Sequence, residues 1–311
     1  MDKKSSIQFM NLDINKLSKD FGKCLILREN LSKYNWFNTG GSADIFFRPD
    51  GKDQLIQFLK EVNKSDLKIH VLGAGSNILI RDKGIQGIVI KLSSKFSKIQ
   101  LLENDKIEVG AATLDRKVSD FARDNNIGQM EFLSCIPGSI GGAVRMNSGC
   151  FGSDISQILL SIKVLDKSGN EKEIKKDEIK FYYRDTNLPK DYIILSAIFQ
   201  GTNVEKKIIE KKQKEFIDKK KISQPSQIKT GGSTFKNNKN KKAWVLIKEA
   251  GCEKLYVGDA KISDKHCNFF VNNGKANSSD IEKLINKVKH EVYLKTGENL
   301  ELEIKIIGDE K

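Results

Sequence analysis

Two glycine-rich loops in this sequence have the composition of a phosphate-binding site. Residues 73–77 (GAGSN) and 137–143 (PGSIGGA) each follow a short apolar run. Consecutive glycines let backbone N–H groups approach an anion closely, and the positive φ angles that they adopt form anion-binding concavities. Ser76, Asn77 and Ser139 add side-chain donors. We therefore interpret the two loops together as a site for a pyrophosphate ligand.

The common nucleotide-binding motifs do not account for these loops. The dinucleotide fingerprint GxGxxG opens a helix and is followed by an acidic residue about 20 positions later. Residues 73–78 read GAGSNI, which lacks the third glycine, and residues 78–80 (ILI) favour a strand. The P-loop ending GK[ST] does not occur in the sequence. Each loop alone is also explained by a tight turn, and it is their occurrence in adjacent units that favours a ligand.

Three later segments carry groups that could act on such a ligand. Arg184 follows a strand-like run and could hold an anion or pair locally with Asp185. Residues 231–237 (GGSTFKN) present a hydroxyl, an ammonium and an amide after flexible glycines, although a plain turn explains them equally well. Glu301 and Glu303 alternate in a predicted strand and therefore face the same side of it. Such a pair is either simple surface or, beside a cationic pocket, a group that steers a reaction.

The overall charge indicates an anionic partner. Lys and Arg number 54 against 41 Asp and Glu, which gives a net charge of +13. This balance suits a nucleic acid, an acidic membrane surface or a phosphorylated small molecule. No run approaches the ~20 apolar residues of a membrane-spanning helix, and the first residues lack the apolar core of a signal peptide. The five cysteines are scattered without a CxxC, and the three histidines lie far apart, so we expect reduced cytosolic thiols and no metal site.

The elements that must position these groups form a leader and three α+β units. Residues 1–34 are predicted as a leader with a short amphipathic helix. Strands are predicted at residues 44–47, 68–72, 78–80 and 88–90, with a helix at 52–63. A second unit runs from about residue 98 to 202.

A highly charged helix is predicted between the second and third units, at residues 203–221. Its apolar stripe is narrow, since it contains Ile208, Ile209, Phe216 and Ile217. A solvated linker is the favoured interpretation and a polyanion-binding element the alternative. The third unit then holds a long helix that begins at a capping box of Ser279 and Glu282.

At these residues the chain closely resembles the UDP-N-acetylenolpyruvoylglucosamine reductases, flavoenzymes of peptidoglycan precursor synthesis. The matching segments occur in the order of the family: NTGGSADIFFRP (38–49), VLGAGSNILI (71–80), IPGSIGGAVRMNSGCFG (136–152), FYYRDT (181–186), GGSTFKN (231–237), AGCEKLYVGDAKISDKHCNFFVN (250–272) and LELEIKIIG (300–308). The resemblance implies an α+β protein with a two-lobed FAD-binding domain of the vanillyl-alcohol-oxidase type at residues 35–202, with lobes of about 35–97 and 98–202. A smaller substrate-binding domain would follow at residues 203–311. The short span from Arg184 to Ser233 resembles the compact branch of the family.

The resemblance also implies roles for single residues. The catalytic arginine, the serine that donates a proton and the catalytic glutamate match Arg184, Ser233 and Glu303. Substrate contacts are implied for Lys236, Asn237 and His266. The FAD-binding residues would be Gly73, Gly75, Ser76, Asn77, Pro137, Gly138, Ser139, Ile140, Gly141, Gly142 and Ala143.

Three positions depart from the family pattern. Asn238 stands where proline usually follows FKN, Thr186 where serine often follows YRD, and Lys305 where arginine is common. None of these changes removes a reacting group. Lys305 keeps its charge but loses the planar fork of a guanidinium, so a substrate carboxylate there would be held less directionally.

The implied activity is reduction of UDP-N-acetylglucosamine enolpyruvate to UDP-N-acetylmuramate, with FAD as cofactor and NADPH as hydride donor. The resemblance implies a cytoplasmic enzyme with a UDP-sugar substrate and without a metal, a nucleic-acid partner, a membrane or an obligate protein partner. Another FAD-dependent oxidoreductase of the same fold, acting on a sugar or an alcohol, is the nearest alternative. A basic nucleic-acid-binding protein is a distant one, because no aromatic–basic binding motif accompanies the positive charge.

Overall fold

The apolar runs near the N-terminus form a four-stranded sheet in the computed structural model, which describes residues 12–238 and 240–310. The strand order is β1 (Leu25–Asn30), β2 (Ser42–Phe47), β5 (Ile85–Ile90), β3 (Ile69–Val71). β1 pairs antiparallel with β2, whereas β2, β5 and β3 are parallel to one another. Successive side chains of a strand point to opposite faces. Ile45 and Phe47 therefore pack under the helices α1 (Ile14–Phe21) and α2 (Lys52–Val62), and Phe46 packs on the other face.

The N-terminal segment contributes to this first lobe. Leu17 and Phe21 of α1 are buried, and the Phe21 ring packs edge-on against Phe47 and Phe58. β1 lies within residues 1–34, which the sequence suggested as a leader, and it forms one edge of the sheet. The described part of that segment is thus packed structure, while residues 1–11 of the expected leader lie outside the described residues.

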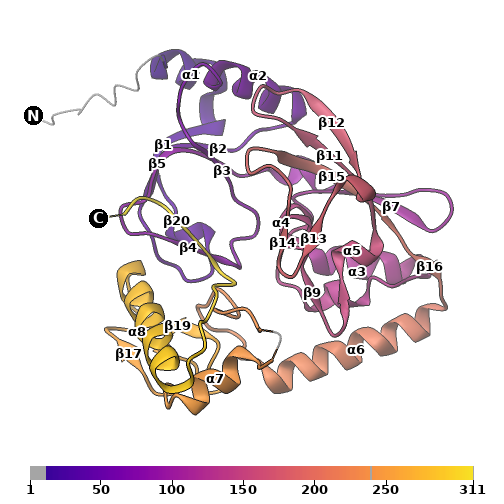
Figure 1. Cartoon of the computed structure of the whole chain (residues 1–311). Helices are drawn as coiled ribbons and strands as arrows, with labels where there is room; N and C mark the ends of the chain where they lie inside the picture. The colour runs from indigo at the N-terminus through magenta and orange to yellow at the C-terminus, as the bar shows by residue number, and fades with distance from the viewer. Residues whose placement is uncertain (1–11, 239, 311) are drawn as a thin grey trace, which may run out of the picture.

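The second lobe is a five-stranded antiparallel sheet (Figure 1). Its order is β12 (Glu171–Lys175), β11 (Leu159–Leu165), β15 (Ile193–Gln200), β7 (Lys106–Gly110), β6 (Ile99–Leu101). Its core is completed by α3 (Asp115–Asp124), the 3₁₀ helix η4 (Glu131–Cys135), α4 (Ile140–Arg145) and α5 (Ile155–Ile158). Leu165, Ile193 and Leu195 extend from this sheet into the core of the first lobe, which joins the two lobes.

Short strand pairs and 3₁₀ turns form the edges of the two lobes. Three of these pairs are β8 (Ile127–Gly128) with β16 (Thr202–Asn203), β9 (Gly149–Cys150) with β10 (Ser153–Asp154), and β13 (Phe181–Tyr182) with β14 (Asp185–Thr186). The 3₁₀ turns are η1 (Gly22–Cys24), η2 (Ser32–Tyr34), η3 (Ser94–Phe96) and η5 (Lys176–Glu178).

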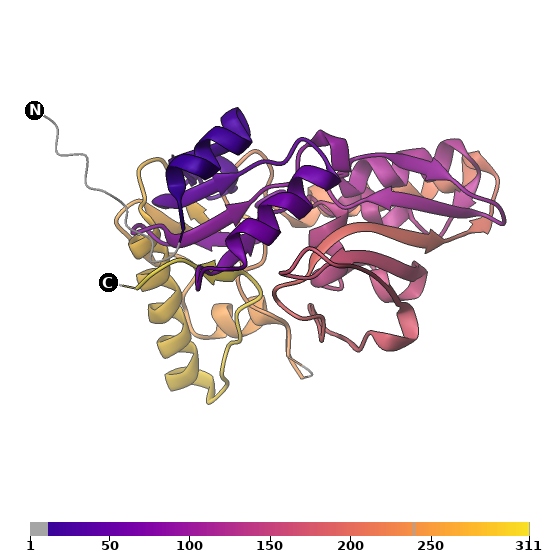
Figure 2. The same ribbon diagram turned by 90° about the horizontal axis from the view of Figure 1, so that it is seen from above.

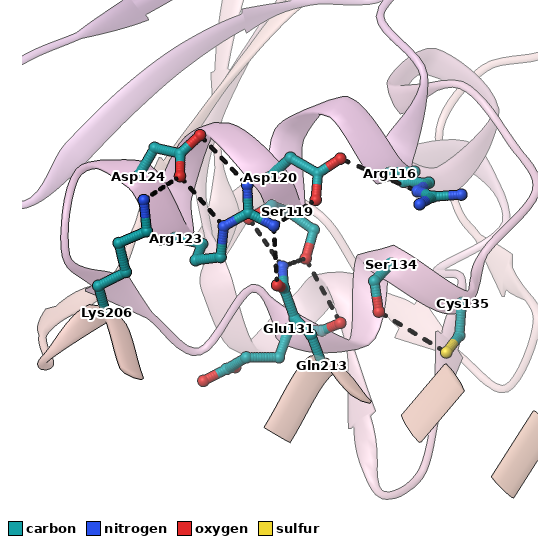
Figure 3. A network of polar contacts seen from close by, with 10 residues as sticks. All are labelled: Arg116, Ser119, Asp120, Arg123, Asp124, Glu131, Ser134, Cys135, Lys206 and Gln213. Carbon is teal, nitrogen blue, oxygen red and sulfur yellow. Dashed lines mark hydrogen bonds and ion pairs between the residues drawn. The ribbon is translucent and has the colours of Figure 1, made fainter. Parts of the chain in front are cut away.

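The charged helix α6 (Lys206–Ser223) lies against the second lobe. Ile209 and Phe216 are buried, but Ile208 of the predicted stripe is 57% exposed. Figure 3 shows how polar contacts attach the helix: Gln213 donates to the backbone and the hydroxyl of Ser119, at 3.0 and 2.7 Å. The helix is therefore docked on its inner side and solvated on its outer side.

The C-terminal unit is built around one long helix, α8 (Ser278–Thr296) (Figure 2). A three-stranded antiparallel sheet of β17 (Tyr256–Val257), β18 (Ala260–Ile262) and β19 (Phe270–Asn272) packs with it, and so does α7 (Ala243–Glu249). The predicted capping box was placed two residues late, because Asn277 caps the helix and Asp280 completes the box. Ser279 instead donates its backbone N–H to Asp82 of the first lobe.

The last strand connects the C-terminal unit to the first lobe. β20 (Lys305–Ile307) pairs in parallel with β4 (Ile78–Ile80), directly after the first glycine loop. The sequence predicted this strand from residue 300, whereas residues 300–304 lie before the paired segment. This pairing holds the C-terminal unit next to the first glycine loop. Within residues 12–238 and 240–310, no helix is long and apolar enough to cross a membrane.

Candidate active site

The two glycine loops lie against each other. A Cβ atom placed on Gly73 would lie 2.8 Å from the hydroxyl oxygen of Ser139 in the second loop. Gly75 has a φ of +73°, and a Cβ there would lie 2.0 Å from the carbonyl oxygen of Tyr34. Only glycine fits this position, because the chain at residues 34–36 crosses directly over it. The prediction that residues far apart in sequence form one glycine-lined site is consistent with this contact.

The second loop is anchored to the end of β7. Ile140 and Gly141 donate their backbone N–H groups to the carbonyl oxygens of Thr113 and Ala111, both at 2.9 Å. Ser139 is extended and immediately precedes α4, but its hydroxyl does not cap the helix. These contacts hold the loop rigidly and direct the Ser139 side chain toward the first loop.

Several buried polar atoms around the second loop lack a partner in the described part of the chain. They are the hydroxyl oxygens of Thr113 and Ser139 and both carboxyl oxygens of Asp115. A Cβ atom on Gly138 would lie 2.5 Å from one of those carboxyl oxygens. Buried polar atoms are rarely left unpaired. The two unpaired hydroxyls therefore fit a diphosphate ligand, which accepts hydrogen bonds, whereas the Asp115 carboxyl could donate to it only when protonated.

Two residues of this region were not found by sequence reasoning. Lys91 follows the buried strand β5 and donates from Nζ to the Gly73 carbonyl oxygen at 2.6 Å. Burial lowers the pKa of Lys91, and the nearby Arg48 acts in the same direction. Asp115 is fully buried, and burial raises the pKa of its carboxyl well above the usual range. The sequence held a signal for each residue. Lys91 is a charged residue directly after an apolar strand, and Asp115 is a charged residue at the start of a helix with an apolar face.

Arg184 and Glu303 form an ion pair although 119 positions separate them. Arg184 Nε lies 2.9 Å from Glu303 Oε1, and Arg184 Nη2 donates to the carbonyl oxygen of Gly149 at 2.7 Å. Burial raises the pKa of Glu303, while the Arg184 guanidinium opposes the rise. The local alternative, pairing with Asp185, is not observed: that carboxylate accepts from the backbone N–H of Thr186. Arg184 has a φ of +58°, a conformation that is uncommon for residues other than glycine.

The segment that carries Ser233 runs beside the segment that carries Glu303. Glu303 donates its backbone N–H to the Thr234 carbonyl oxygen at 2.9 Å. Among residues 12–238 and 240–310, none is hydrogen-bonded to the Ser233 hydroxyl, which is partly exposed. Asn77 of the first glycine loop donates from its side chain to the Glu303 carbonyl oxygen at 3.1 Å. Backbone contacts thus place the proposed catalytic segments at the edge of the first loop.

The three predicted substrate contacts lie around the same segment. Lys236 Nζ is 4.0 Å from Glu301, whose side chain is 78% exposed. Asn237 accepts the backbone N–H of Ala243 at the start of α7, which leaves its amide nitrogen available. His266 accepts the backbone N–H of Asn268 at Nδ1, and burial lowers its pKa. Glu301 and Glu303 therefore differ strongly in burial, although their alternation suggested equal environments.

The structure explains two of the departures from the family pattern. Asn238 accepts the backbone N–H groups of Asn240 and Lys241, so its side chain forms the turn that proline would otherwise restrict. Thr186 donates its hydroxyl to the Arg145 carbonyl oxygen, as a serine could. Lys305 is exposed, and its backbone N–H donates to the Asn77 carbonyl oxygen.

Comparison with known proteins places this arrangement in a family. A family model described as UDP-N-acetylenolpyruvoylglucosamine reductase, C-terminal domain, matches residues 224–307, and one described as FAD binding domain matches residues 43–175. The UDP-N-acetylenolpyruvoylglucosamine reductase of Pelagibacter ubique (strain HTCC1062) is 48% identical over 298 residues, covering 95% of this chain and 98% of that protein. The chain belongs to the UDP-N-acetylenolpyruvoylglucosamine reductase family.

Further comparisons agree with this assignment. The reductase of Rickettsia akari (strain Hartford) is 43% identical over 279 residues, covering 90% of this chain and 94% of that protein. The crystal structure of the reductase from Thermus caldophilus superposes with a TM-score of 0.79 at 30% identity, covering 91% of this chain and 97% of that one. The predicted α+β fold, an FAD-binding domain followed by a smaller α+β domain, is confirmed.

We expect Gly138→Ala to weaken FAD binding without unfolding the protein. The new methyl group would collide with the buried Asp115 carboxyl, and relieving such overpacking costs about 1–3 kcal/mol. The dissociation constant for FAD should rise about tenfold or more. Titration of apoprotein by flavin fluorescence measures this, with circular dichroism as the test of folding. In Gly142→Ala the nearest atom lies 3.9 Å away, so this variant should bind clearly better than Gly138→Ala. Equal affinities would contradict the steric argument.

Proposed function

We propose that Arg184, Ser233 and Glu303 complete the reduction of an enol ether to a lactyl ether. The enzyme is an NADPH-dependent UDP-N-acetylenolpyruvoylglucosamine reductase with FAD as cofactor, and its substrate is the UDP-sugar of that reaction. Residues 73–77 and 137–143 would hold FAD, which would supply the hydride for the methylene carbon of the enolpyruvyl group. The observation that supports the residue roles is the Arg184–Glu303 pair beside the Ser233 segment.

Arg184 would stabilise the charge that hydride addition creates. Addition at the methylene carbon pushes electrons into the adjacent carboxylate, which then carries two negative charges. A guanidinium provides several permanently charged donors in a rigid plane, and this one is held by Glu303 and by the Gly149 carbonyl. We assign Glu303 the task of orienting Arg184, because its carboxylate accepts from Nε at 2.9 Å.

Ser233 would deliver the proton to the α-carbon. Its hydroxyl has no competing partner among the described residues, so it is available to the substrate. A serine is a weak acid in water and needs a strongly basic carbanion-like acceptor, which the dianionic intermediate provides. Two backbone hydrogen bonds join the segment of Lys236 to that of Glu303. Lys236 would help to compensate the charge that develops, and we propose it as a substrate contact together with Asn237 and His266.

The two glycine loops would hold the diphosphate of FAD. We propose that role for residues 73–77 and 137–143, with Ser139 donating its unpaired hydroxyl. Lys91, whose Nζ donates to the Gly73 carbonyl oxygen, would support the same anion. We further propose that the enzyme works in the cytoplasm without an obligate protein or nucleic-acid partner, and that residue 203 begins the substrate-binding domain.

The test is to purify the protein, record its flavin absorbance and follow NADPH oxidation on that sample. NADPH oxidation should accelerate strongly when UDP-N-acetylglucosamine enolpyruvate is added, and UDP-N-acetylmuramate should form in equal amount. Turnover with other sugars or alcohols, and none with the UDP-sugar, would favour a different oxidoreductase of this fold. Colourless protein that cannot be reconstituted with FAD would contradict the proposal.

A further inference from the structure

Two cysteines from separate segments meet beside the second glycine loop. Cys135 ends η4, two residues before that loop begins, and Cys150 lies in β9. The Cys150 thiol donates to the carbonyl oxygen of Phe132 at 3.4 Å, and Phe132 belongs to the same 3₁₀ turn as Cys135. The two thiols also interact electrostatically, and β9 packs against η4. Both side chains belong to the core of the second lobe.

The surroundings make the two thiols chemically different. The neighbouring Cys150 thiol lowers the pKa of the Cys135 thiol, and the charge of Lys220 adds to this effect against the opposing effect of burial. Lys220 Nζ also donates to the Cys135 carbonyl oxygen at 2.6 Å. The same pairing raises the pKa of Cys150. Cys135 therefore has the character of an attacking thiolate, and Cys150 that of a thiol that keeps its proton.

A small oxidant can reach Cys135. The residue is only 6% exposed, but it forms part of the wall of a pocket of about 230 Å³ at the end of α6. Figure 3 shows Ser134 next to Cys135, with the two side chains in contact at 3.7 Å. The pocket is lined by, among others, Arg116, Ser134, Cys135, Lys220, Lys221 and Pro225. Its cations favour the thiolate form of a cysteine.

We propose that Cys135 and Cys150 form a peroxide-sensitive dithiol whose oxidation to a disulfide slows the reductase. The Cys135 thiolate attacks one oxygen of hydrogen peroxide, and the O–O bond breaks. With one proton taken up, this gives the sulfenic acid and one water. The Cys150 sulfur then attacks the sulfenic sulfur, forming the S–S bond and releasing a second water. The two thiols together lose two electrons and two hydrogens, and the peroxide is reduced to two waters.

The disulfide would act on Arg184 through the strand that holds both. Gly149, the neighbour of Cys150, accepts from Arg184 Nη2 at 2.7 Å. Closing an S–S bond of about 2.05 Å would draw the two sulfurs together, and β9 would take up part of this movement by shifting toward η4. The Gly149 carbonyl shifts with it and releases or tilts the guanidinium. This effect on turnover rests on the proposed role of Arg184, whereas formation of the disulfide does not.

The experiment treats reduced holoenzyme with hydrogen peroxide and measures the bond and the activity separately. Mass spectrometry of an unreduced digest should show a peptide that links Cys135 to Cys150. The kcat should fall about tenfold or more, because displacing a catalytic group by 1 Å costs up to ~100-fold. Dithiothreitol should restore it. FAD content should stay constant, which separates the effect from cofactor loss.

Substitutions separate this pair from the other thiols. Cys150→Ser should form no disulfide and should trap a sulfenic acid at Cys135 that reacts with dimedone. Cys135→Ser should be insensitive to peroxide at the same dose, whereas Cys252→Ser and Cys267→Ser should behave like the parent protein. Absence of the linked peptide in the oxidised parent overturns the proposal. A linked peptide with unchanged kcat overturns the regulatory effect and leaves the proposed function intact, and a reduced enzyme without turnover contradicts the proposed function instead.

Discussion

Ser233→Ala should leave reduction of the flavin by NADPH intact and stall reoxidation of the flavin by the UDP-sugar. The first half-reaction involves no proton transfer to the substrate carbon, whereas the second requires one. Loss of a general acid typically costs 10²- to 10⁴-fold, so reoxidation should slow by about that factor. Stopped-flow absorbance at the flavin band measures each half-reaction separately.

The control for this variant is Ser223→Ala, which removes an exposed hydroxyl at the end of α6. Both half-reactions should keep their parental rates in the control. Equal slowing of the two half-reactions in Ser233→Ala would remove Ser233 from the proton-donating role, because only a disturbed flavin site would slow both. Deuterium incorporation at the α-carbon in heavy water provides an independent readout of the same step.

Arg184→Lys should reduce kcat by about 10²- to 10³-fold, the cost of losing one preorganised donor to a developing oxyanion. In the parent protein one guanidinium binds Glu303 and Gly149 through different nitrogens. A single ammonium keeps the charge but cannot reproduce this fork or its fixed orientation. Steady-state kinetics with the UDP-sugar measures the loss, and flavin reduction by NADPH should remain near normal.

A matched change at another paired arginine tests whether the effect is local. Arg123 also binds two carboxylates, Asp120 and Asp124, but it lies in the network on α3. Arg123→Lys should leave kcat unchanged, because ion pairs near the surface contribute little to stability and because that network lies outside the proposed site. A near-normal kcat in Arg184→Lys would show that charge alone suffices and would contradict the proposed role of the fork.

Local sequence determined the elements and the glycine-rich composition of the two loops. The helix at residues 52–63 and the strands around 44–47, 78–80 and 88–90 follow from apolar periodicity, which depends on near neighbours only. The glycine at position 75 is likewise readable, since a positive φ at a tight loop needs no side chain. The family could also be identified from the sequence, because several segments of the chain match the motifs of the family and occur in the same order.

Only the tertiary structure decided which of these groups work together. The alternation of Glu301 and Glu303 predicted one shared face, yet one carboxylate is exposed and the other is buried against a guanidinium from a different unit. Arg184 had an acidic neighbour in sequence but pairs across 119 positions. The adjacency of Cys135 and Cys150, the burial of Asp115 and the contact between Lys91 and Gly73 also depend on how the lobes pack. Burial and pairing are set by the sum of distant contacts, whereas a local pattern specifies only the element on which a side chain lies.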